Sequence, residues 1–90
     1  GESMSKAYRK HAVAKAIESW DISEWFSADS ILPRAHEALP QSHMSINVYA
    51  VAKALTVLES KGVLSSRKSG GVKEYSRIEG VWDGRSHFHA

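Results

Sequence analysis

The segment Ser45–Ile78 constrains the fold of this chain most strongly, because three local signals follow one another within it. Ser45 is a good N-cap residue, and apolar residues recur after it at helical spacing as far as about Lys61. Gly62 comes next, and a glycine in this place typically ends a helix in the left-handed conformation. Two stretches typical of strands then flank a Ser-Gly-Gly turn at residues 69–71. The segment is therefore predicted to be a helix that stops at a glycine and leads into a hairpin.

The side chains of this segment separate into a buried and an exposed set. On a helical wheel five of them fall together and are expected to face the core: Val48, Val51, Ala52, Leu55 and Leu58. Six others fall on the remaining faces: Ile46, Asn47, Tyr49, Ala50, Lys53 and Val57. The hairpin strands are expected at residues 63–68 and 72–78, with Leu64 and Tyr75 against the helices. Three cations are then expected around the exposed tip: Arg67, Lys68 and Lys73.

Two more helices are predicted before this segment. The first, from Ser5 to Trp20, is rich in alanine and carries one apolar stripe of Val13, Ile17 and Trp20. The second runs from about Ser30 to Leu39, with Asp29 or Ser30 as its N-cap. Its start is placed there because Pro33 is tolerated in a first turn but breaks a helix interior. The expected buried stripe of this second helix is Leu32, Ala35 and Leu39, with Pro40 ending the helix.

The composition is that of a single globular domain. Ninety residues with 42% hydrophobic and 24% charged side chains can form one core but not two. No apolar run approaches the roughly 20 residues of a membrane span, and no signal peptide opens the chain, so no membrane partner and a cytoplasmic location are expected. The absence of cysteine excludes disulfides and thiolate metal sites. Residues 1–3, ahead of Met4, resemble a remnant of an expression tag, which places the domain at 4–78 and a tail at 79–90.

The positive charge is unevenly distributed. The formal net charge is only +2, yet residues 45–90 carry seven Lys or Arg against four acids, whereas residues 1–44 carry five against six. The excess therefore lies in the predicted helix and hairpin, where contacts to phosphate would be needed.

With these elements in place, the chain resembles the winged helix-turn-helix superfamily of DNA-binding domains over about Lys6 to Ile78. The most specific part is the stretch ALTVLESKGVL at residues 54–64, where leucines seat the helix and the glycine lets the chain reverse into the ribbon. The resemblance implies an α+β, mainly α fold: a three-helix winged helix-turn-helix with a C-terminal β-wing of two to three strands. It also implies that Trp25-Phe26-Ser27 is a short strand that pairs with the wing.

The function that the resemblance implies is binding of double-stranded DNA, with the third helix in the major groove and the wing on the backbone. Asn47 has the donor and acceptor that suit adenine, and Lys53 can reach phosphate or guanine. A small transcriptional regulator without a cofactor is expected, which pairs as a homodimer or with a protein partner on two half-sites. The candidate DNA-binding residues are Ser45, Asn47, Tyr49, Ala50, Lys53, Arg67, Lys68 and Lys73, with Ile46 on the same face of the helix.

A second hypothesis keeps the fold but replaces DNA with a protein partner. The contact surface would then be apolar and consist of Ile46, Tyr49, Val57, Trp82 and Phe88. Trp82 is expected either to fold back on the domain or to form part of a dimer contact. RNA binding is a weaker third hypothesis, since no aromatic platform on a sheet is evident. Metal binding is not expected, because His87 and His89 lack a third ligand. Catalysis is not expected either, because no set of nucleophile, base and orienting residue can be recognised in the sequence.

Overall fold

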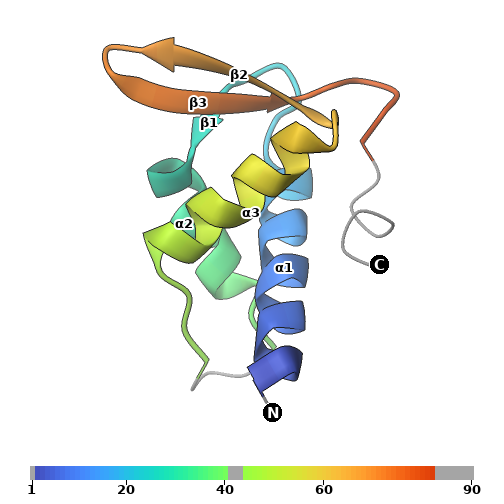
Figure 1. Ribbon diagram of the computed structural model, residues 1–90, viewed down its shortest axis with the longest axis vertical. Coiled ribbons are helices and arrows are strands. Elements are labelled where there is room, and N and C mark those ends of the chain that lie inside the picture. The colour runs from blue at the N-terminus through green and yellow to red at the C-terminus, as the bar shows by residue number, and fades with distance from the viewer. Residues whose placement is uncertain (1, 41–43, 83–90) are drawn as a thin grey trace.

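The computed structural model describes residues 2–40 and 44–82. Within these ranges the chain forms helices and an antiparallel sheet in the order α1 (Glu2–Ser19), β1 (Phe26–Ser27), α2 (Ala28–Glu37), α3 (Val48–Ser60), β2 (Leu64–Ser69) and β3 (Val72–Arg77). Figure 1 shows the sheet lying across one end of the helices, with α3 running obliquely to α1. The predicted α+β class, with more helix than strand, is confirmed. None of the helices in these two ranges combines the length and hydropathy that a membrane span requires.

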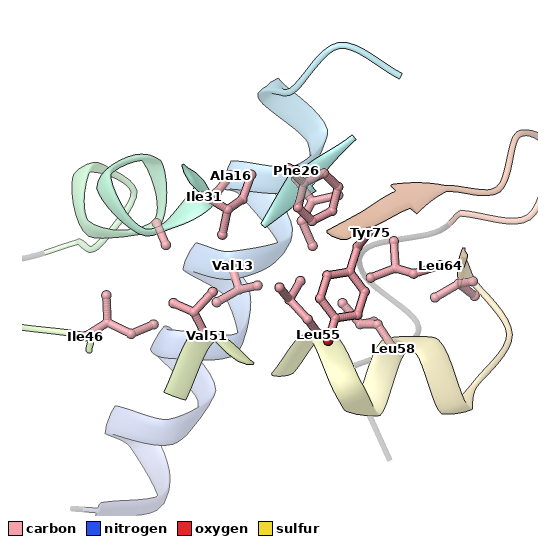
Figure 2. Close-up of a cluster of buried hydrophobic side chains, with 13 residues drawn as sticks. Val13, Ala16, Phe26, Ile31, Ile46, Val51, Leu55, Leu58, Leu64 and Tyr75 are labelled. Carbon is pink, nitrogen blue, oxygen red and sulfur yellow. The ribbon is translucent and has the colours of Figure 1, made fainter. Parts of the chain in front are cut away.

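The hydrophobic core lies where the three helices meet the sheet (Figure 2). Val13 and Ile17 of the α1 stripe are buried as predicted, and so are Val51, Leu55 and Leu58 of the α3 stripe. Val48 and Ala52, which were also predicted to face the core, are only half-buried and lie outside the buried cluster. Leu64 and Tyr75 lie against the helices as expected. Burial of a leucine or isoleucine side chain stabilises a fold by about 1.5–3 kcal/mol, so the α3 stripe alone holds that helix firmly in place. The buried cluster comprises Val13, Ala16, Ile17, Phe26, Ile31, Ala35, Ile46, Val51, Leu55, Leu58, Val63, Leu64 and Tyr75.

The sheet has the order β1-β3-β2, so β3 is its central strand. The short strand predicted at Trp25-Phe26-Ser27 is confirmed as β1, in which Phe26 pairs with Tyr75 of β3. The rings of Phe26 and Tyr75 stack with their centroids 6.2 Å apart. Hairpin β2–β3 closes with the pair of Ser69 and Val72 around Gly70 and Gly71, both of which have positive φ. This two-residue turn matches the right-handed twist of the strands that it joins.

Helix α2 begins earlier than predicted. Its N-cap is Ser27, whose hydroxyl accepts a hydrogen bond from the Ser30 amide at 3.1 Å while the Ser30 hydroxyl accepts one from the Ser27 amide at 2.7 Å. This reciprocal capping box makes the predicted N-caps wrong. Pro33 therefore lies inside the helix and not in its first turn. The carbonyl that loses its donor to Pro33 belongs to Asp29, in an exposed first turn where water can replace it.

The bounds and buried faces of α1 and α2 also differ in detail from the prediction. Helix α1 begins at Glu2, three residues before the expected start. In α2 the fully buried residues are Ile31, which the predicted stripe omits, and Ala35. Leu32 and Leu39 are only half-buried and pack against the edge of the core. Ile31 and Ala35 are four residues apart, so the stripe retains its helical period but is centred about one residue earlier.

The start of α3 was predicted wrongly as well. The N-cap is Asn47 and not Ser45, and its side-chain oxygen accepts a hydrogen bond from the Ala50 amide at 2.9 Å. Ile46 thus precedes the cap, in the position from which an apolar residue packs toward the fourth residue of the helix, here Val51. Ile46 is consequently 8% exposed and belongs to the core, contrary to its predicted place on an outer face.

The end of α3 follows the prediction. Gly62 has a φ of 81°. Its amide donates to the Glu59 carbonyl at 2.9 Å, and the Val63 amide donates to the Leu58 carbonyl at 3.2 Å. These two bonds form a Schellman motif, and burial of Leu58 and Val63 supplies its usual apolar contact. The chain therefore leaves α3 at a fixed angle and enters β2 directly.

Candidate nucleic-acid interface

The outer face of α3 is polar and lies opposite the buried stripe. Because Val51, Leu55 and Leu58 point into the core, residues about half a turn away on the wheel must face solvent. Tyr49 is the most prominent of them, at 81% exposed, and Lys53 follows it one turn later. We use the name outer face for Tyr49, Lys53, Thr56 and Ser60.

The outer face carries a positive charge without a competing carboxylate. The sole acid of α3, Glu59, lies on the side of the helix next to the hairpin, where it accepts hydrogen bonds from the ammonium group of Lys73 at 2.9 Å and from the Ser66 hydroxyl. The hydrogen bond from Lys73 and then that from Ser66 lower the pKa of Glu59, and the same bond to Glu59 raises the pKa of Lys73. Lys53 makes no hydrogen bond or ion pair with any described residue.

The hairpin cations are less available than their number indicates. Lys73 is bound to Glu59 and lies 5.3 Å from the centre of the Tyr75 ring. Arg67 donates to the Glu74 carboxylate at 2.9 Å and stacks over the Trp25 ring at 4.4 Å. The contacts of Lys73 with Glu59 and of Arg67 with Trp25 link the hairpin to the rest of the domain, whereas the pair of Arg67 and Glu74 joins its two strands.

Lys68 is the third hairpin cation. It is exposed, faces Lys73 across the strands, and makes no hydrogen bond or ion pair within the described part of the chain.

Two arginines act as parts of the scaffold. Arg34 donates to the Ser19 carbonyl at 2.8 Å and lies over the Trp20 ring, 4.7 Å from its centre. Arg77 donates to the Trp20 carbonyl at 2.7 Å. Both guanidinium groups thus satisfy carbonyls at the C-terminal end of α1, where backbone acceptors lack helical partners. Their charges contribute less to an external phosphate site than a count of basic residues suggests.

The predicted helix residues are only partly brought together. Tyr49 and Lys53 lie on the outer face, whereas Ser45 precedes the helix and its carbonyl accepts a hydrogen bond from Arg9 at 3.3 Å. The side-chain oxygen of Asn47 is occupied by the helix cap, and Ala50 is half-buried on the side of α3 that faces α1.

Thr56 and Ser60 were missed by the prediction. Thr56 is seven residues after Tyr49, and Ser60 is seven residues after Lys53. Residues seven apart lie on the same face of a helix, and that spacing is the signal that could have found them. Their hydroxyls donate to the Ala52 and Val57 carbonyls, which leaves their lone pairs as acceptors.

The apolar surface predicted for a protein partner is not assembled as expected. Ile46 is buried, and Trp82 is half-buried and packs against the core, so it folds back on the domain. Phe88 lies outside the described residues, as do His87 and His89. Of that set, Tyr49 and Val57 are exposed, the latter at 38%.

Comparisons with other proteins leave the function to be argued from the geometry. No family model matches the chain, and searches of characterised proteins and of solved structures also found no match. Among residues 2–40 and 44–82, no three His, Cys, Asp or Glu side chains gather in a way that could hold a metal ion.

Proposed function

We propose that this protein binds double-stranded DNA in the manner of a winged helix-turn-helix domain and acts as a transcriptional regulator or accessory factor. The outer face of α3 would enter the major groove, and hairpin β2–β3 would lie on the adjacent backbone. The observation that carries the proposal is the charge of this face. Lys53 stands on it beside the exposed ring of Tyr49, while the only carboxylate of α3 is neutralised on another side by Lys73. The order of the elements and the pairing of β1 with the hairpin also support it.

Each exposed side chain has a distinct part in this proposal. Lys53 donates to phosphate or to guanine, and the Tyr49 hydroxyl donates to phosphate while its ring can contact a thymine methyl. Lys68 at the hairpin tip contacts the backbone. Asn47 keeps only its amide donor, because its oxygen caps α3, so the bidentate contact with adenine that was predicted would require the cap to open.

Arg67 and Lys73 are held in exposed ion pairs, which are weak enough to exchange a carboxylate for a phosphate. Four side chains therefore set the electrostatic part of binding. Lys53 and Lys68 would contact phosphate directly, and Arg67 and Lys73 would do so after exchanging their carboxylate partners for phosphate. Each neutralised phosphate contributes about −0.9 to the slope of log K against log salt, so the expected slope is roughly −2 to −4 for each bound chain. Pairing of two chains on two half-sites would supply the remaining affinity.

A duplex-binding titration tests the proposal. Fluorescence anisotropy with a labelled duplex of about 20 base pairs should show binding at low salt, with the slope given above. Lys53→Ala is expected to weaken binding about five- to tenfold and to reduce the salt slope by about one. Lys15→Ala is the matched control, because Lys15 is an exposed cation of α1 that lies toward α2. Absence of binding at low salt, or equal effects of the two substitutions, would refute the proposal.

A further inference from the structure

A shallow groove of about 380 Å³ runs between α1 and α3. It lies on the side of α3 away from Glu59, and it is separate from the contacts that fix the hairpin. The small side chains of Ala50 and Ala54 leave the space open between the two helices. Five apolar side chains line the groove: Val13, Ile46, Ala50, Ala54 and Val57.

The charged residues that line the groove all have the same sign. Arg9 and Lys10 from α1 and Lys53 from α3 line it, and no carboxylate does. The hydrogen bond from Arg9 to the Ser45 carbonyl holds that guanidinium beside the groove. Lys10 and Lys53 make no hydrogen bond or ion pair with described residues. By contrast, the depression between α1 and α2 contains Glu37 together with Lys15 and Arg34.

We propose that the groove between α1 and α3 binds an acidic amphipathic helix of a partner protein. An apolar floor requires apolar side chains from its ligand, spaced as on one face of a helix. Cations on both sides of that floor require carboxylates that flank the apolar stripe. Nucleic acid would bring negative charge as phosphate, but its charged backbone offers no apolar stripe for the floor of the groove. A second copy of this chain is disfavoured, because a two-fold contact through the groove would bring like charges together.

The proposed site adjoins the DNA-binding face through one residue. Lys53 lines the groove and also stands on the outer face of α3. An acidic helix and DNA would therefore compete for this ammonium group, and the partner would reduce DNA affinity when bound. Lys10 belongs to the groove alone, so a substitution there separates the two activities.

The test uses a defined probe and the full chain. The probe is a fluorescein-labelled helical peptide of about 16 residues, with leucines at positions i, i+3, i+4 and i+7 and glutamates on the flanking positions. A control peptide carries lysine in place of every glutamate. We expect saturable binding of the acidic peptide that weakens with salt, and no binding of the lysine peptide.

Two charge reversals on the same helix provide the matched comparison. Lys10→Glu should weaken binding of the acidic peptide about tenfold, because an attraction becomes a repulsion, while Lys15→Glu should change it less than twofold. The two substitutions should have equal effects on DNA affinity. Val57→Glu, at an exposed position of the groove, is a second variant and should also block the peptide.

Several results would overturn the inference. Equal effects of Lys10→Glu and Lys15→Glu, equally tight binding of the lysine peptide, or no saturable binding would each do so. Self-association that Val57→Glu abolishes would assign the groove to a second copy. NMR shifts of the Ala50 and Ala54 amides with duplex but not with the peptide would assign it to nucleic acid. Failure of duplex binding alone would refute the proposed function and leave this inference intact.

Discussion

Asn47 has two competing assignments, and one pair of substitutions distinguishes them. In the structure its side-chain oxygen caps α3 through the Ala50 amide. Ser45, the N-cap that the sequence favours, makes no side-chain hydrogen bond within the described residues. We therefore predict that Asn47→Ala destabilises the protein and that Ser45→Ala does not.

The magnitude follows from the environment of the cap. Removal of an N-cap side chain costs about 0.5–2 kcal/mol, typically about 1 kcal/mol. Asn47 is exposed, so water can reach the orphaned Ala50 amide, and the expected cost for Asn47→Ala is about 1 kcal/mol. For a domain of this size that cost lowers Tm by about 4–8 °C. Ser45→Ala should change the free energy of unfolding by less than about 0.5 kcal/mol.

Asn47→Asp provides the internal control. It keeps the acceptor oxygen and adds a negative charge at the N-terminus of α3, whose first turn contains no acidic residue. Interaction with the helix dipole should leave stability unchanged or raise it by about 0.3–1 kcal/mol. Its new charge lies beside the proposed DNA face, so duplex affinity should fall although stability does not.

Urea denaturation followed by circular dichroism measures all three variants. The midpoint should fall for Asn47→Ala alone, with the slope of free energy against urea unchanged. A larger loss for Ser45→Ala than for Asn47→Ala would refute the reasoning, because it would place the helix start two residues earlier. Equal losses for Asn47→Ala and Asn47→Asp would show that the cap oxygen is not what stabilises α3.

Two further predictions concern stability. Ile46→Ala should cost about 2–4 kcal/mol in urea denaturation, because Ile46 is buried, whereas Tyr49→Ala on the outer face should cost less than about 0.5 kcal/mol; similar costs would contradict the burial of Ile46. The ion pair of Glu59 and Lys73 should stabilise the protein across neutral pH. Its contribution should disappear as pH falls through the lowered pKa of Glu59, below the ordinary value of 4.5, and as pH rises through the raised pKa of Lys73, above 10.5. Glu59→Gln should reduce both the acid loss and the alkaline loss, because Glu59 makes the first of the contacts that raise the pKa of Lys73; an unchanged pH profile would contradict the pairing.

The features predicted correctly depend on signals that act over a few residues. The buried part of the α3 stripe, at Val51, Leu55 and Leu58, follows from helical spacing. The stop at Gly62 follows from a positive φ that suits glycine. The turn at Gly70 and Gly71 follows in the same way from its two positive φ values. Helix starts were harder to predict, because several capping residues stand close together. Ser45 and Asn47 are both good caps, and burial of Ile46 decides between them.

The sequence by itself therefore determined the elements and their order, but not the starts of α2 and α3, because periodicity and turn residues are local signals whereas the choice between neighbouring caps was not. The tertiary structure alone decided which charges are available. Glu59 and Lys73 are fourteen residues apart, and only the docking of the hairpin on α3 brings them within 2.9 Å. The groove between α1 and α3 likewise exists only because two distant helices pack with small residues between them. Contacts of this range depend on the placement of whole elements, which local sequence signals do not specify.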